Sequence, residues 1–459
     1  MLDPAADHLE RVGLAPLRRT TWRYWLLLAF LAAVAGLGFY AYADQLSKGL
    51  SVTGMRVSLN KIIWGLYITN FVFFIGISHA GTLISAILRV SKAGWRTPIT
   101  RMAEFITVVA LLVGGLFPLI DMGRPDRVLN LLRFGRWQSP ILWDVLAIAT
   151  YLTGSLIYLY LPLIPDLATC RDLIGGGVGR VRGWLFRTFS VGWNDAPDQR
   201  RNLTSAIGLM MILIIPVAVS VHTVVSWIFA MTLRTGWNTA VFGIYFVAGA
   251  IFSGTATLII VIAVLRRVYH LEEYITERHF VNLGYLLVSL ALIMMYFNLS
   301  EYLTSGYKIG AAEHVYLGQI FTGSFAPLYW LYVLGGLVLP CLIVLYRRTR
   351  SLKGVLVAAV LVDVAMWIER YIIVVASLRT PQMPYPSLAS YLPSAVELAI
   401  TAGAFALFAL LIAVFVKLFP LISMWEIREH QEAVPAPDAV PVGRAVLPEV
   451  RPAPGGAEA

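Results

Sequence analysis

The fold of this chain is set by apolar stretches such as residues 60–88, which read NKIIWGLYITNFVFFIGISHAGTLISAIL. A helix that crosses about 30 Å of hydrocarbon needs about 20 predominantly apolar residues, and this stretch exceeds that length. Similar stretches recur along the 459 residues, of which 58% are hydrophobic and 14% are charged. Because soluble domains carry about 25% charged residues, we predict an all-α integral membrane protein with little room for a soluble domain.

Glycine, proline and clusters of charged residues divide the chain into ten predicted spans. These spans are residues 22–43, 60–88, 99–120, 141–164, 204–231, 239–265, 281–303, 325–346, 353–377 and 395–423. The polar segment 166–202, which contains amphipathic residues, is expected to lie on the membrane surface. Residues 427–459 are rich in Ala, Pro, Val and Glu, which predicts a disordered tail.

The distribution of Lys and Arg predicts the orientation of the spans. Segment 1–21, the loops after even-numbered spans and the tail together hold more than twice as many Lys and Arg as the opposite loops. Positively charged loops stay in the cytoplasm, so both termini are expected there. One external loop is an exception, since it carries Arg124, Arg127, Arg133 and Arg136. These arginines are either a tolerated excess or part of a docking surface or site wall.

An internal repeat relates the second span to the sixth. At an offset of 178 residues, 64–67 (WGLY) aligns with 242–245 (FGIY). Asp121 and Glu301, which end the third and seventh spans, follow nearly the same offset. This pattern predicts two related four-helix bundles with two peripheral helices. The predicted segments are the bundles 58–235 and 236–380, a first helix with its external loop at 22–57 and a last helix within 381–426.

Ionisable residues at bilayer depth are costly, and each is therefore a candidate for function. In the first bundle these candidates are His79, Asp121, Asp144 and His222. His222 and the two aspartates are expected toward the outer surface, and His79 deeper. Further candidates, for a proton path, are Glu104, Glu301, Asp363, Glu369 and Arg370. The alternative for each is a polar group that only stabilises the packing of neighbouring helices.

These residue types suit the oxidation of a quinol, which loses two protons as it is oxidised. An imidazole can accept a hydrogen bond from the quinol hydroxyl and take its proton near neutral pH. A desolvated carboxylate can receive and release that proton. We therefore predict catalytic roles for His222, Asp121, His79 and Asp144. The predicted quinone-binding residues are Trp64, Tyr67, His79, Asp121 and His222.

Other cofactors and partners fit the sequence less well. Cys170 and Cys341 form no metal-binding motif, and neither a phosphate-binding loop nor an iron–sulfur cysteine cluster is present in the sequence. Of seven histidines, only His79 and His222 fall well inside spans, which allows at most one bis-histidine haem. The basic residues lie between spans rather than in a patch interleaved with aromatics, which argues against nucleic acid.

Three stretches together resemble the NrfD-like family of polysulfide reductase membrane subunits. They are residues 64–81, from WGLY to GISHAG, the turn 121–125 (DMGRP) and residues 220–227 (SVHTVVSW). The resemblance covers roughly the second to ninth spans, and ten spans favour the ActC-type branch of bacterial alternative complex III. It implies a menaquinone or ubiquinone site near the periplasmic side of the first bundle. It also implies that the chain itself holds no haem or iron–sulfur cluster.

The resemblance further implies a multi-pass subunit of the bacterial cytoplasmic membrane, in a respiratory or photosynthetic complex. An adjacent iron–sulfur subunit would receive the electrons and pass them to haem c subunits, beside other membrane subunits. Proton translocation would suit the carboxylates of both bundles. Two other interpretations stay open. The repeat and the polar groups near the membrane midplane also describe secondary transporters, and the chain could be a structural anchor for peripheral redox subunits.

Overall fold

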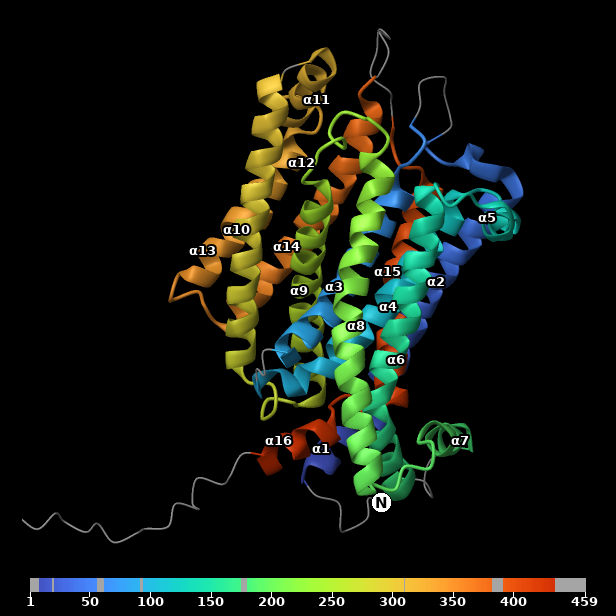
Figure 1. Ribbon diagram of the computed structural model, residues 1–459, viewed down its shortest axis with the longest axis vertical. Coiled ribbons are helices and arrows are strands. Elements are labelled where there is room, and N and C mark those ends of the chain that lie inside the picture. Colours follow the sequence, from blue (N-terminus) through green and yellow to red (C-terminus); the bar gives the residue numbers. More distant parts are fainter. Residues whose placement is uncertain are drawn as a thin grey trace, which may run out of the picture.

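The computed structural model describes residues 8–18, 20–55, 62–90, 94–174, 180–308, 310–381 and 391–433. Within these ranges every regular element is a helix (Figure 1). Nine helices of the described residues are long and apolar enough to cross a membrane. The prediction of an all-α integral membrane fold is therefore confirmed.

The helices follow the predicted spans closely, although several are longer. Those that qualify as spans are α2 (Trp22–Lys48), α3 (Leu66–Val90), α4 (Thr97–Asp121), α6 (Pro140–Ile174), α8 (Pro197–Ala230), α9 (Phe242–Tyr269), α10 (Glu277–Lys308), the composite α12 (Ala326–Trp330), η4 (Leu331–Val338) and α13 (Leu339–Leu345), and α15 (Ala395–Leu418). The tenth predicted span is α14 (Leu352–Arg379), whose 28 residues are long enough to cross. It differs from the nine because Asp363, Glu369 and Arg370 lie along it.

Two four-helix bundles form the body of the molecule, as the repeat predicted. Helices α3, α4, α6 and α8 pack together, and α9, α10, the composite span and α14 form the second group (Figure 1). The repeat-related helices α3 and α9 pack directly on each other, and a Cβ at Gly76 would lie 3.3 Å from Ser253 Oγ of α9. Because α3 is central, its apolar window is entirely buried. Polar side chains on α3 are therefore shielded from lipid.

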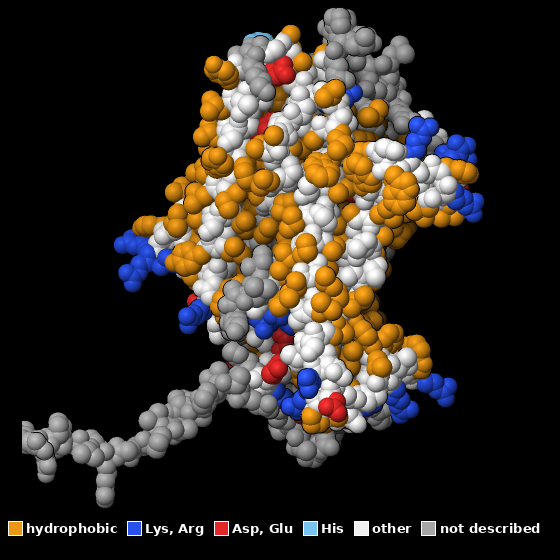
Figure 2. All heavy atoms as spheres, viewed as in Figure 1, with side chains coloured by type: hydrophobic (Ala, Val, Ile, Leu, Met, Phe, Trp, Pro, Cys, Tyr) orange, Lys and Arg blue, Asp and Glu red, His pale blue; other side chains and the backbone are white. Residues whose placement is uncertain are grey.

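The first and last spans are peripheral and pair with each other beside α4. A Cβ at Gly38 of α2 would lie 2.8 Å from Gly403 Cα of α15, so only small residues allow this approach. Side chains on the other face of α2, such as Trp25 and Phe30, are exposed. Figure 2 shows hydrophobic side chains over the middle of one face of the molecule, with Lys and Arg gathered at its margins. This is the distribution expected for a surface in contact with lipid.

The eighth span is continuous, but its middle segment η4, which contains Gly335 and Gly336, is a π-helix. A Cβ at Gly336 would lie 2.1 Å from the Cβ of Ala365, so the glycine allows close packing against α14. The corresponding fourth span, α6, continues as one helix through Pro162 and Pro165. The π-helical segment is therefore not repeated in the first bundle.

The short elements lie at the two ends of the bundles. Helices α1 (His8–Arg18), α7 (Arg180–Phe189) and α16 (Met424–Ala433) lie at one end, which we call the inner end, and α5 (Val128–Phe134) and α11 (Ala311–Phe321) lie toward the other (Figure 1). The remaining short helices are η1 (Gly49–Val52), η2 (Gly94–Arg96) and η3 (Pro125–Arg127). Both described terminal helices share one end, as ten crossings require. The names inner and outer follow the predicted orientation.

Two polar segments differ from their predicted structure. Asp166, expected in a surface segment, lies buried inside α6, because Arg101 neutralises it at 2.5 Å. Helix α6 continues to Ile174 and α8 begins at Pro197, so α7 is the only helix wholly within 166–202 among the described residues. Residues 427–433, expected to be disordered, continue α16, whose Ile427 is buried. The rest of that tail lies outside the described residues.

Candidate functional site

The fold brings His79 of α3 and His222 of α8 together in the first bundle. Both are fully buried, and their ring centroids lie 4.3 Å apart. His79 Nε2 lies 2.6 Å from the Ala218 carbonyl oxygen, and its Nδ1 lies 2.7 Å from the Ile75 carbonyl oxygen. A carbonyl oxygen only accepts, so both contacts are hydrogen bonds only when both ring nitrogens carry protons. Backbone carbonyl oxygens thus hold His79 through both ring nitrogens, and protonation of the ring allows the second of the two hydrogen bonds to form.

His222 has a different environment. Neither of its ring nitrogens has a hydrogen-bond partner among the described residues. Phe246 of α9 lies 6.0 Å away between ring centroids, and Tyr151 of α6 lies 5.1 Å from His79 on the other side of the pair. Leaving a buried polar group unpaired costs about 1–3 kcal/mol, so the position favours a further hydrogen-bonding group or water. Backbone carbonyls therefore hold His79, whereas no described group holds the ring nitrogens of His222.

Aromatic side chains cover the outer side of the histidine pair. Trp64 stacks on Trp237 at 6.2 Å and meets the edge of Phe229 at 5.6 Å. Phe229 in turn lies 5.8 Å from Phe246, and the Trp237 indole N–H donates to the Ile373 carbonyl at 2.7 Å. The predicted ring-packing residue Trp64 therefore contacts protein aromatics. Trp237 and Phe229 were missed because they lie at span ends, where hydropathy does not single them out.

A second group, nearer the outer end, contains Tyr67, Asp121 and Gln45. We call these three residues the outer cluster. The Tyr67 hydroxyl donates to Gln45 Oε1 at 2.5 Å, and Gln45 Nε2 donates to the Ile120 carbonyl at 2.9 Å. Asp121 follows Ile120 directly and acts electrostatically on Tyr67. Gln45 was missed because the first span was predicted to end at residue 43.

The outer cluster and the histidine pair are separate places. Tyr67 and His79 lie on the same helix, about 18 Å apart along its axis at 1.5 Å per residue. At about 100° per residue they also differ by about 120° around that axis. The outer cluster faces α2 and α4, whereas the histidines face α6 and α8. One headgroup cannot contact both groups.

Asp144 lies on α6 near its outer end. It is buried, and its Oδ1 has no hydrogen-bond partner among the described residues. None of the described hydrogen bonds or ring contacts joins it to the histidine pair or to the outer cluster. Its predicted catalytic role stays a prediction.

Hydroxyl groups continue from the histidine pair toward the inner end of α3. Thr107 Oγ1 donates to the Ser78 carbonyl at 2.8 Å, and Thr82 Oγ1 donates to Thr107 Oγ1 at 3.2 Å. One turn farther, Ser85 Oγ donates to Glu104 Oε1 at 2.9 Å. Glu104, a predicted proton-path residue, is therefore placed on a line of polar groups that begins at His79.

In the second bundle the predicted proton-path residues Glu369 and Arg370 form a buried pair at 3.3 Å. The Tyr245 hydroxyl donates to Glu369, and the Arg370 guanidinium lies 4.7 Å from the ring centre of Phe246, the ring that also neighbours His222. Asp363 accepts a hydrogen bond from Thr257 at 2.9 Å, and Glu301 is half-buried on α10. The pair Glu369–Arg370 thus approaches the histidine pair across the bundle boundary.

The histidine pair does not fit a haem. Axial imidazoles lie on opposite faces of the porphyrin, each with one ring nitrogen on the iron. His79 has both ring nitrogens against backbone carbonyls, and the His222 ring lies in direct contact with it. The hypothesis of a bis-histidine haem is therefore wrong for this arrangement.

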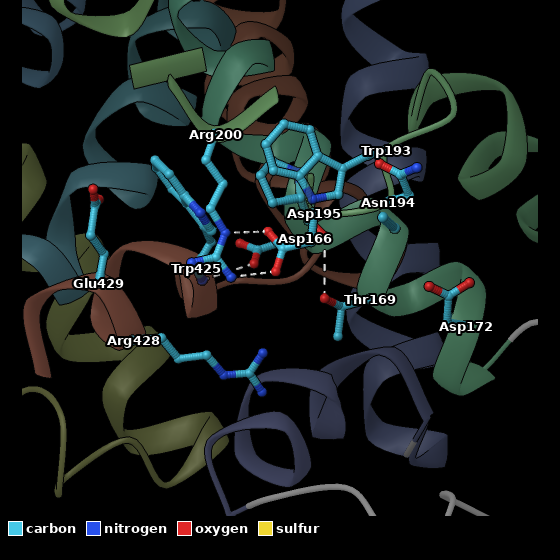
Figure 3. Close-up of a pocket in the computed structure, with 12 residues that line it drawn as sticks. Asp166, Thr169, Asp172, Trp193, Asn194, Asp195, Arg200, Trp425, Arg428 and Glu429 are labelled. Atoms are coloured by element: carbon cyan, nitrogen blue, oxygen red, sulfur yellow. Dashed lines mark hydrogen bonds and ion pairs between the residues drawn. The ribbon is translucent and has the colours of Figure 1, made fainter. Parts of the chain in front are cut away.

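A pocket of about 240 Å³ lies at the inner end, far from these groups (Figure 3). The side chains of Asp166, Asp195, Arg200 and Trp425 surround it. Asp195 accepts from Arg200 Nε at 2.7 Å, and Asp166 is paired with Arg101 and accepts from the Trp425 backbone N–H at 3.0 Å. These charges are satisfied within the chain, and their contacts fasten α16 to the first bundle. The pocket is therefore structural.

The external arginine loop forms η3 and α5. Arg124 binds Asp126 with Nε and a terminal nitrogen at 3.0 and 2.9 Å, and this hydrogen bonding lowers the pKa of Asp126 below its usual value. The apolar residues Leu129, Phe134 and Trp137 are exposed beside the arginines. The surface is therefore both basic and apolar, which is compatible with the predicted docking role.

The chain is similar in sequence to a known protein family and to several known proteins. The polysulphide reductase NrfD family profile matches residues 54–382. A protein named as a dimethyl sulfoxide reductase membrane subunit, from Halobacterium salinarum, is 33% identical over 243 residues, 53% of this chain and 51% of its own length. A selenate reductase subunit of Mesobacillus selenatarsenatis is 23% identical over 90% of this chain and 98% of its own. The Hdr-like menaquinol oxidoreductase integral membrane subunit of Archaeoglobus fulgidus is 23% identical over 89% and 96%.

Proposed function

Since the chain belongs to the polysulphide reductase NrfD family, we propose that it binds and oxidises quinol as a membrane subunit of a multisubunit electron-transfer complex. The observation that carries the proposal is a series of proton-accepting groups on α3 and on the helices packed beside it. It begins at the outer cluster, continues at His79 with His222, and ends at Glu104. Such a series suits a reaction that releases protons. The arrangement of the two histidines does not fit a bis-histidine haem.

Quinol, when bound, supplies two electrons and two protons. We assign its headgroup to the outer cluster, where the Asp121 carboxylate can accept a hydroxyl proton and Tyr67 and Gln45 can orient the ring oxygens. His222, predicted to touch the headgroup, lies too deep for this, and we assign it with His79 to a proton relay. Protonation of His79 satisfies both carbonyl oxygens that face it, which stabilises the proton in transit.

The finer assignments follow from this role. We propose that electrons leave to an iron–sulfur subunit and then to haem c subunits, as in alternative complex III, with the arginine loop as their docking surface. We further propose that the route from His79 through Thr82 to Glu104 takes part in proton translocation across a bacterial cytoplasmic membrane. A relative named as a menaquinol oxidoreductase subunit supports a quinol donor. Two relatives named as reductase subunits support a partnership with other chains.

The transporter alternative has less support. Transporters of repeat architecture place discontinuous helices at corresponding positions of the two halves. Here η4 is a π-helical segment of one helix that runs from Ala326 to Leu345, and its counterpart α6 is also continuous. A structural anchor would not need the unpartnered His222 or the relay of hydroxyl groups.

The test is quinol oxidation by the intact complex, purified through this subunit. We expect iron–sulfur and haem c subunits to co-purify, and Asp121→Asn to lower the rate about 100-fold, because positioned proton transfer contributes at least that much. The matched control is Asp198→Asn, which changes an exposed carboxylate in the first turn of α8, away from the outer cluster and the arginine loop. Full activity in Asp121→Asn would overturn the headgroup site. Purification as a lone protein that oxidises no quinol would favour transport.

A further inference from the structure

An apolar groove of about 160 Å³ opens between α2, α4 and α15. Its lining consists of apolar side chains, glycines and Tyr42, with no charged side chain among the described residues. Ala35 and Gly38 of α2 and Gly403 and Ala404 of α15 form its walls, and Leu116 lies on the α4 side. The glycines bring α2 and α15 together, and the alanines leave space beside that contact.

The groove leads to the outer cluster. Ile120 lines the groove, and the carbonyl of this residue accepts the hydrogen bond from Gln45, which holds Tyr67. Asp121 is the next residue. Tyr42, one turn before Gln45 on α2, also lines the groove. The apolar groove and the outer cluster therefore meet at Ile120.

We propose that this groove binds the head-proximal part of the isoprenoid tail of the quinone and guides the molecule from lipid to the outer cluster. This inference rests on the proposed function and adds the access route and the surface that binds the tail. The groove is apolar throughout, as such a tail is, and its volume suits only the beginning of a long chain. The remainder of the tail lies in the bilayer, beside the exposed face of α2.

A phospholipid acyl chain shares the apolar chemistry of the tail, but the polar end of the groove disfavours it. The described side chains that form hydrogen bonds at this end, Tyr67 and Gln45, are uncharged, whereas an anionic phosphate is bound best by Lys or Arg. The hydroxyls of a quinol are uncharged and can donate to a carboxylate. Hydrogen-bonding character at this end therefore favours a quinol over an anionic headgroup.

The experiment compares two quinols with the same headgroup in the intact complex: one with a long polyprenyl tail, and a short quinol with a methyl group in place of the tail. Ala404→Phe fills the groove, and we expect it to raise KM about tenfold for the long-tailed quinol and less than twofold for the short one. Leu116→Trp fills the groove from α4 and should do the same. The matched control is Ala149→Phe, which fills a different lipid-facing groove between α6 and α8 and should change neither KM.

Three outcomes would overturn the proposal. Both groove variants could leave the long-tailed KM unchanged, or they could raise the KM of both quinols equally. A phospholipid that mass spectrometry finds bound to the wild type and lost from Ala404→Phe, without any change in KM, would assign the groove to an acyl chain. Failure of the wild-type complex to oxidise either quinol would instead contradict the proposed function. The two failures are thus distinguishable.

Discussion

The two bundles are related by repeat, yet they place different chemistry at equivalent positions. Tyr67 and Tyr245 align, but Tyr67 donates to Gln45 of the peripheral helix α2, whereas Tyr245 donates to Glu369 of its own bundle. At the position of His79 the second bundle has Thr257, which binds Asp363. The first bundle therefore holds two neighbouring imidazoles, and the second holds carboxylates whose polar partners lie within the bundle.

The difference follows from what surrounds each bundle. The first is flanked by α2 and α15, which supply Gln45 and the walls of the apolar groove. Among the described residues, no such peripheral pair covers the second bundle. A duplicated scaffold thus became asymmetric through the helices added outside it. We infer that quinol is bound and oxidised in the first bundle, whereas the second bundle contributes buried charged groups. Three predictions test this division.

The largest expected effect is on stability, in the second bundle. Arg370→Met removes the cation beside the buried Glu369 and leaves that carboxylate uncompensated, which should lower the free energy of unfolding by about 3–5 kcal/mol. Thermal unfolding in detergent measures the change. Arg124→Met, which breaks an exposed ion pair, should cost less than about 1 kcal/mol. The double variant Arg370→Met with Glu369→Gln should recover most of the loss. Equal losses in the single variants would show that the pair does not stabilise the bundle.

A smaller effect is expected when the first bundle is made to resemble the second. His79→Thr introduces the residue of the aligned position, removes the imidazole from the relay and leaves His222 without its neighbour. We expect quinol oxidation to fall about tenfold, with KM unchanged, because the headgroup site lies about 18 Å away along α3. Steady-state kinetics at several quinol concentrations separates the two parameters. The control Thr257→Ser keeps the hydroxyl that binds Asp363 and should match the wild type. A change in KM alone would return His79 to the headgroup site.

The sequence predicted which polar residues lie in membrane-spanning helices better than it predicted their depth or the helix face that they occupy. Hydropathy placed His79, Asp121 and His222 inside or at the ends of spans, and the alignment of 64–67 with 242–245 identified the two bundles. The pairing of His79 with His222 depended on how α3 and α8 are rotated, which packing decides. The separation of twelve residues between Tyr67 and His79 already indicated different faces of the helix, and this signal was available from the sequence.

Residues with a tertiary partner were the hardest to predict. Asp166 was expected at the surface because it is charged, but Arg101 from α4 lies 2.5 Å away and allows its burial. Gln45 lies just beyond the apolar stretch of the first span, and only the position of α2 against α3 and α4 places it between Tyr67 and Ile120. Composition carries no information about such pairs, because they join segments that are distant in sequence.

The smallest expected effect compares the two aligned tyrosines. Tyr67→Phe removes the hydroxyl that fixes Gln45, so the outer cluster loses one hydrogen bond, which contributes about 1 kcal/mol. We expect KM for quinol to rise about fivefold, the factor to which that energy corresponds, with a smaller change in kcat. Tyr245→Phe removes the equivalent hydroxyl in the second bundle and should lower stability without changing KM by more than about twofold. Measuring KM and the unfolding temperature for both variants separates binding from stability. If Tyr245→Phe raised KM as much as Tyr67→Phe, the quinol site could not belong to the first bundle alone, and the asymmetry between the bundles would not be functional.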